Sequence, residues 1–112
     1  MKLYNQKCIP CNGNIPPFSK SDIKIYLKKL KKWKATINKK KGYYLIKNYK
    51  FKNFLQSLNF IKKISIISEN EGHHPDISFG WGYARIIICT HAINGLSKSD
   101  FILASKIDRI SV

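Results

Sequence analysis

The spacing of hydrophobic residues divides the chain into segments with different expected structures. Residues 1–18 contain proline and glycine breakers and no regular period, which predicts an irregular lead-in. The period then becomes helical, with apolar residues at spacings of three and four. We therefore expect a first helix that begins at Ser19 or Ser21 and ends near Lys31.

Two pairs of strands are predicted, one on each side of a central segment. Residues 33–38 and 43–51 are rich in aromatic and β-branched side chains, and they flank a polar turn that ends in Gly42. Residues 76–81 and 83–90 form the second pair around a turn with two glycines. Each pair is expected to fold as an antiparallel hairpin.

The central segment, residues 53–71, has a mixed pattern. Its apolar residues recur at helical spacing, whereas residues 64–67 have strand propensity. The absence of proline and glycine over this length favours one long helix, and Gly72 stands where a left-handed C-terminal cap is expected.

A last helix is predicted from Ser97 to about Asp108, with Asp100 at the capping-box position. The element order is then α-β-β-α-β-β-α. This order predicts an α+β fold with a four-stranded antiparallel sheet and three helices packed on one face. We expect residues 1–112 to form a single domain.

Composition adds expectations about the cellular setting. A hydrophobic fraction of 44% over 112 residues suits one modest core, and domains of this size often gain burial by self-association. No apolar run approaches the ~18 residues of a membrane helix. Residues 1–10 lack the pattern of a secretory signal, and three cysteines are an odd number for a disulfide framework. We therefore expect a cytoplasmic protein without membrane association.

The formal net charge of +15 raises the question of nucleic-acid binding. The positive charge is almost all lysine, whereas base and phosphate recognition usually draws on the rigid fork of arginine. Seventeen lysines and a single acid, Asp22, precede Glu69, while the remainder of the chain has five acids and four basic residues. We attribute the lysines to compositional drift and look for specific chemistry in the nearly neutral second half.

All three histidines, His73, His74 and His91, lie in that second half, on either side of the second hairpin. A turn centred near Gly82 pairs position 73 with 91, and a centre half a residue later pairs 74 with 91. Either register brings His91 within about 5 Å, Cβ to Cβ, of one adjacent histidine. Pro75 biases His74 toward an extended conformation, so His73 and His74 are expected to point to opposite sides.

Convergent imidazoles favour acid–base chemistry, because the unperturbed pKa of imidazole is near ~6.5. Glu69 lies four residues before His73 and is expected to reach the same cavity. A zinc site is the rival interpretation, but His-Glu-x-x-His spacing is absent and adjacent extended histidines rarely chelate one ion. We expect no metal, and we interpret Cys8-x-x-Cys11 as a loop feature because no second cysteine pair exists.

The segment Glu69-Asn-Glu-Gly-His-His-Pro-Asp76 resembles the signature of the pterin-4a-carbinolamine dehydratases. The segment Cys89-Thr-His91 and the following Gly95-Leu-Ser-x-x-Asp100 are similar to the same family, and the spacing between the histidines agrees. The resemblance runs from about residue 21 to residue 110, and Cys89 stands where the family often has Ser or Thr.

The resemblance implies dehydration of a 4a-hydroxytetrahydropterin to quinonoid dihydropterin and water, which recycles the pterin cofactor of aromatic amino acid hydroxylases. It assigns acid–base roles to His73 and His91 and pterin binding to His74, so all three are candidate catalytic residues. It implies a homodimer or homotetramer and requires no metal or organic cofactor. The remaining residues that it places at the substrate pocket are Glu69, Gly72, Pro75, Cys89, Thr90 and Asp100.

A non-catalytic dimerisation module or a nucleic-acid-binding module is the alternative interpretation. The basic first half of the chain supports it. Binding to DNA or RNA that weakens steeply with added salt would favour this alternative.

Overall fold

The computed structural model describes residues 2–10 and 13–112 and confirms the α+β fold. Among these residues the order of helices and strands is the predicted one. The helices are α1 (Lys20–Leu27), α2 (Phe54–Glu71) and α3 (Lys98–Ile107), with short 3-10 helices at Leu3–Asn5 and His91–Ile93. The strands are β1 (Lys34–Ile37), β2 (Tyr43–Lys50), β3 (Asp76–Gly80) and β4 (Tyr83–Ile88).

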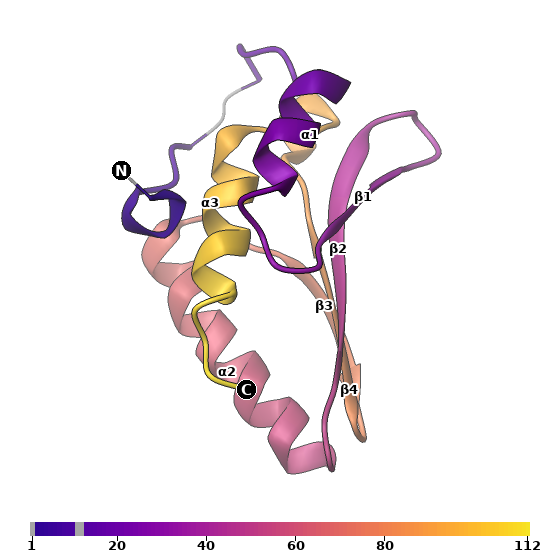
Figure 1. Ribbon diagram of the computed structural model, residues 1–112, viewed down its shortest axis with the longest axis vertical. Coiled ribbons are helices and arrows are strands. Elements are labelled where there is room, and N and C mark those ends of the chain that lie inside the picture. Colours follow the sequence, from indigo (N-terminus) through magenta and orange to yellow (C-terminus); the bar gives the residue numbers. More distant parts are fainter. Residues whose placement is uncertain (1, 11–12) are drawn as a thin grey trace.

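The four strands form one antiparallel sheet in the order β1-β2-β4-β3, and the helices cover one of its faces (Figure 1). The central strands contribute fully buried side chains, among them Leu45 on β2 and Ile86 on β4. Ile64 of α2 and Phe101 of α3 belong to the same core. Burial of these apolar side chains, each about 1.5–3 kcal/mol, holds the helical layer on the sheet.

The central segment is helical throughout, despite the strand propensity of residues 64–67. Its buried positions, Ser57, Phe60, Ile64 and Ser68, follow helical spacing, so the segment can bury one face only as a helix. The Asn53 side chain accepts the Gln56 N–H at the start, and Gly72 ends the helix with a left-handed φ of 65°.

Two predicted boundaries were wrong. Helix α1 ends at Leu27, one turn before the predicted Lys31, because the Lys31 N–H donates instead to Asp108 Oδ2, at 2.9 Å. Strand β4 ends at Ile88, since Thr90 forms its bridge with Gly95 rather than with β3. The lead-in also contains regular structure, the 3-10 helix at residues 3–5.

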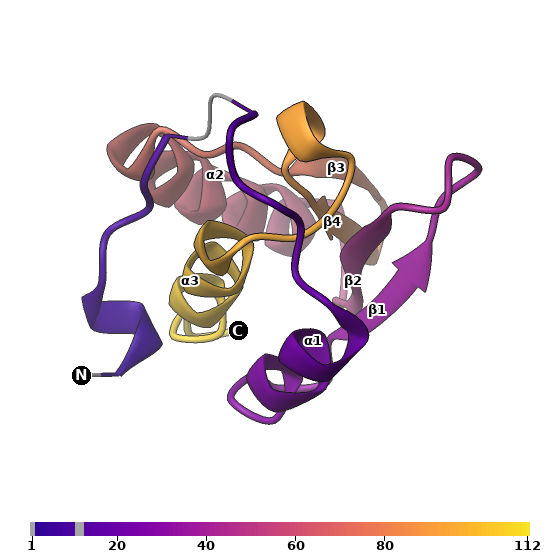
Figure 2. The ribbon, with the colours of Figure 1, turned by 90° about the horizontal axis from the view of Figure 1, so that it is seen from above.

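We define the N-terminal strap as Leu3–Ile9, a segment that runs beside α2 and α3 (Figure 2). Leu3 and Cys8 are buried, and the Arg109 guanidinium lies 4.3 Å from the centre of the Tyr4 ring. The Cys8 N–H donates to Glu71 Oε1 at 2.9 Å. The strap is therefore part of the packed structure.

The Gly72 cap offers a test of the helix boundary. A Cβ at this position would meet no atom within 4 Å, so a substitution adds only backbone strain. We expect Gly72→Ala to lower the free energy of unfolding by about 1 kcal/mol. The decrease should be smaller for Gly72→Asn, because asparagine tolerates the left-handed region. Equal urea midpoints for the alanine variant and the wild type would contradict this assignment.

The carboxylate of Glu71 should make stability depend on pH. Partial burial acts to raise the pKa of Glu71. Hydrogen bonds from Lys106 and the Cys8 N–H, together with the charges of Lys106 and Lys7, outweigh this effect and lower the pKa overall. A lowered folded-state pKa means that the stabilisation is present above the unfolded value and is lost as the pH falls through the folded value. Urea unfolding of wild type and Glu71→Gln should therefore differ near neutral pH, and the difference should shrink in acid. A difference that is constant with pH would show that Glu71 is not responsible.

Candidate active site

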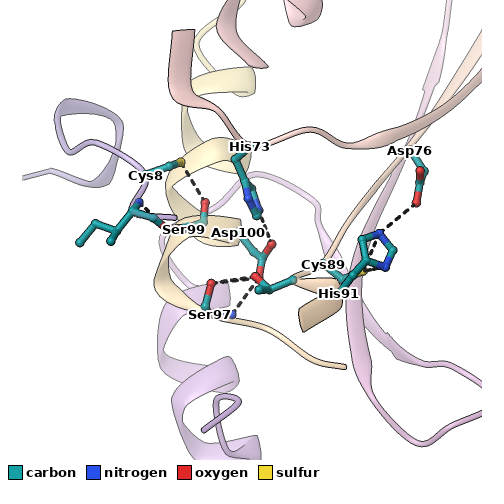
Figure 3. A network of polar contacts seen from close by, with 10 residues as sticks. Cys8, His73, Asp76, Cys89, His91, Ser97, Ser99 and Asp100 are labelled. Carbon is teal, nitrogen blue, oxygen red and sulfur yellow. Dashed lines mark hydrogen bonds and ion pairs between the residues drawn. The ribbon is translucent and has the colours of Figure 1, made fainter. Parts of the chain in front are cut away.

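His73 is held by a buried carboxylate. The left-handed Gly72 turns the chain out of α2, and the His73 side chain then points toward the start of α3 (Figure 3). Its Nε2 lies 2.7 Å from Asp100 Oδ1, and the Asp100 side chain is completely buried. The pair therefore joins the end of one helix to the first turn of another.

The second oxygen of Asp100 is also satisfied. Oδ2 accepts the Thr90 hydroxyl at 2.7 Å and the Ser97 N–H at 2.8 Å, the latter in the predicted capping box. An ionised carboxylate only accepts hydrogen bonds, so His73 Nε2 carries the donated proton. The other ring nitrogen, Nδ1, is the one that Asp100 does not contact.

His74 has a different partner from its neighbour His73. Its Nε2 pairs with a carboxylate oxygen of Glu69 in the last turns of α2. Both side chains are exposed, and an exposed ion pair contributes little to stability. A ligand can therefore displace this pair at low cost.

The predicted pairing of His91 with position 73 or 74 is wrong. The observed register pairs Gly80 with Tyr83 and Asp76 with Ile87, so the turn is Trp81–Gly82 and its centre lies earlier than expected. Continued beyond the sheet, this register would place position 74 opposite 89 rather than 91. The chain also leaves the sheet after Ile88, which puts His91 into a 3-10 helix.

His91 nevertheless lies beside the His-His-Pro segment. Its Nε2 is 3.8 Å from Oδ2 of Asp76, the residue after Pro75, and its Nδ1 is 3.8 Å from Cys89 Sγ. Figure 3 shows the His91 ring directed toward Asp76, away from Asp100. The sequence interpretation gave Asp76 no role of its own, although its place as the first residue of β3 could have indicated this contact.

A cavity of about 330 Å³ opens next to His91. The β1–β2 turn forms one wall, because Asn38 Nδ2 donates to Asn94 Oδ1 at 2.9 Å and Asn94 Nδ2 donates to the Lys40 carbonyl at 3.1 Å. The sequence interpretation missed this wall, although Asn94-Gly95 is a turn signal. The residues that line the cavity are Asn38, Lys40, Tyr44, Ile87, Cys89, His91 and Asn94.

Two predicted pocket residues have particular roles in this geometry. Burial, with the charges of Asp100 and Asp76, raises the pKa of the Cys89 thiol, so Cys89 remains a neutral thiol rather than a nucleophilic thiolate. Thr90 is buried, and its hydroxyl contacts Asp100 and Ser97. Thr90 therefore supports the carboxylate that holds His73.

A second cavity in the described part of the chain lacks histidine side chains. A larger cavity of about 640 Å³ lies at the opposite end of α2, lined by Lys50, Lys52 and Lys63 among others, and contains no histidine.

Within residues 2–10 and 13–112, no group of three or more His, Cys, Asp or Glu side chains is placed to hold a metal ion. Cys11, half of the Cys8-x-x-Cys11 pair, lies outside the described residues. No helix in the described part of the chain is long and apolar enough to span a membrane.

The described chain is thus a small α+β protein in which Asp100 holds one histidine, His73, and a second histidine, His91, lines a cavity. The profile of the pterin 4 alpha carbinolamine dehydratase family matches residues 16–110, and the chain belongs to this family.

Comparisons with individual proteins agree with this assignment. A Rickettsia bellii protein named "Putative pterin-4-alpha-carbinolamine dehydratase" is 46% identical over 107 residues, which cover 95% of this chain and 91% of the relative. The crystal structure of a transcriptional coactivator/pterin dehydratase from Brucella melitensis has a TM-score of 0.73 at 22% identity, covering 81% of this chain and 94% of that one. A pterin dehydratase-like RuBisCO assembly factor of the alpha-carboxysome has a TM-score of 0.57 at 23% identity, covering 68% and 84%. At these identities the two structures show a shared fold.

The Thr90 hydrogen bond to Asp100 can be tested by stability. Thr90→Val keeps the shape but removes a donor from a fully buried carboxylate, so we expect a loss of about 1–3 kcal/mol in the free energy of unfolding. Thr36→Val, at an exposed position on β1, serves as the matched control and should change little. Equal effects of the two substitutions in urea unfolding would contradict the role of Thr90.

Proposed function

We propose that the protein dehydrates 4a-hydroxytetrahydropterin to quinonoid dihydropterin in the cytoplasm, recycling the pterin cofactor of aromatic amino acid hydroxylases. The observation that carries this proposal is the fixed His73–Asp100 pair, with His91 and its cavity close to the same chain segment. Membership of the family supports the choice of substrate class.

The reaction needs two proton transfers and no redox partner. The C4a–O bond breaks and the hydroxyl leaves as water after it receives a proton, while a ring nitrogen loses a proton as the C4a–N double bond forms. Two imidazoles that both give and take protons near neutral pH suit these steps.

The geometry suggests how the roles divide. Because Asp100 holds the Nε2 proton of His73, the free Nδ1 is the base that takes the ring proton. His91 is exposed, so it can protonate the leaving hydroxyl and regain its proton from solvent. His74 and Glu69 lie on the accessible side, where they would bind and orient the pterin ring.

The same proposal includes self-association. Leu55 and Ile66 of α2 are more than 60% exposed, and Phe54 is nearly half exposed. Apolar side chains in such positions are commonly covered by a second subunit. A homodimer or homotetramer formed through α2 is consistent with these features.

The proposed roles predict large losses of rate on removal of either histidine. We expect His73→Ala and His91→Ala each to lower kcat/KM by a factor of about 10²–10⁴, the usual contribution of a general acid or base. Stopped-flow absorbance with 4a-hydroxytetrahydropterin, corrected for the reaction in buffer, is the measurement. Lys52→Ala, in the cavity at the far end of α2, is the control and should keep wild-type activity.

If the wild type does not accelerate dehydration over buffer, or if both histidine variants match it, the site does not catalyse this reaction. Salt-dependent binding of DNA or RNA that is unaffected by the histidine substitutions would then favour the non-catalytic module.

A further inference from the structure

We propose that the N-terminal strap positions the His73–Asp100 pair, by clamping Glu71, two residues before His73, to Ser99, the residue before Asp100. The effect of the strap on catalysis rests on the proposed function. Its effect on the His73–Asp100 contact does not. It also gives a purpose to the Cys8 region, which the proposed reaction does not use.

The strap binds Ser99 through three hydrogen bonds. The Ile9 N–H donates to Ser99 Oγ at 2.9 Å, and the same hydroxyl donates to the Ile9 carbonyl at 3.2 Å. The Cys8 thiol donates to the Ser99 carbonyl at 3.4 Å. Ser99 and Cys8 are both buried, and the bond between the Cys8 thiol and the Ser99 carbonyl is fully buried, whereas the two bonds with Ile9 are partly buried.

The strap also binds the C-terminal end of α2, through Lys7 and Cys8. Glu71 Oε1 accepts the Cys8 N–H, and its Oε2 receives Lys106 Nζ of α3 at 2.8 Å. Lys7 Nζ also donates to the Asn70 carbonyl at 2.9 Å. One short segment therefore holds the last turn of α2 against α3, immediately behind the two residues that form the pair.

The arrangement in space agrees with this role. In the view of Figure 3, Cys8 and Ser99 lie on one side of the His73–Asp100 pair, while His91 and Asp76 lie on the other. The strap also precedes the segment matched by the family profile, which begins at residue 16. The contacts of the strap thus support the site from outside the matched segment.

Positioning matters here because the pair joins the residue after the Gly72 cap of α2 to the first turn of α3. His73 follows a left-handed glycine, and Asp100 lies in the first turn of α3, so a small shift of either helix end would change the 2.7 Å contact. Displacements of about 1 Å at a reacting group can lower a rate by a factor of about 10².

The experiment compares two buried serines of α3. Ser99→Ala removes both hydroxyl contacts with Ile9, whereas Ser105→Ala removes only a bond to the Ile102 carbonyl within the helix. In ¹⁵N-histidine-labelled protein, we expect the hydrogen-bonded His73 Nε2 proton to exchange with solvent at least about 10-fold faster in Ser99→Ala. Ser105→Ala should keep the wild-type exchange rate, even if both variants lose similar thermal stability.

A second pair of variants keeps the test valid if Ser99→Ala folds poorly. Ile9 is 75% exposed, so Ile9→Pro removes the N–H donor with little loss of packing, while Ile9→Ala retains that donor. We expect faster exchange of the His73 proton and a lower kcat with little change in KM for the proline variant alone.

The results distinguish this inference from the proposed function. An unchanged His73 proton and unchanged kcat in Ser99→Ala and Ile9→Pro would overturn the positioning role, even with an active wild type. Faster exchange in those variants, in a protein without dehydratase activity, would support the positioning role and refute the proposed reaction.

Discussion

The buried carboxylate of Asp100 is the constraint that organises this end of the molecule. Removing an ionised carboxylate from water costs several kcal/mol unless hydrogen bonds replace the lost hydration. Here the donors come from three separate segments: His73 after α2, Thr90 after β4, and Ser97 before α3. Satisfying one side chain therefore requires the ends of two helices and a strand to meet.

This constraint divides the site into a fixed half and an adjustable half. His73 has a side chain that is 17% exposed and is fixed through Asp100, whereas the side chains of His74 and His91 are 58% and 78% exposed. The exposed imidazoles are paired with exposed carboxylates, which hold them weakly. In the proposed reaction, exposed and weakly held groups would receive the ligand, while the position of His73 is already fixed by Asp100.

Local patterns predicted the helices and strands well, because caps and burial periods are properties of neighbouring residues. Ser19, Asn53 and Ser97 begin helices as their chemistry suggests, and Gly72 ends one. The contacts of the site were harder to predict, because they depend on where distant segments meet. The hairpin turn lies earlier than expected and the chain leaves the sheet after Ile88, so His91 does not pair with position 73 or 74. The docking of the strap has no periodic signal at all, since its hydrogen bonds are made largely by backbone groups.

The buried His73–Asp100 pair is difficult to explain by stability alone. A buried ionic or polar pair is often no more stabilising than apolar side chains of the same volume, so stability alone is a weak reason for its presence. The same fold also occurs in a protein described as a RuBisCO assembly factor, which shows that the architecture does not determine the activity. What the pair provides, and an apolar replacement could not, is an imidazole with a defined proton on Nε2 and a free Nδ1 directed by a rigid support. That property is useful for proton transfer, and it links the buried His73–Asp100 pair to the proposed chemistry.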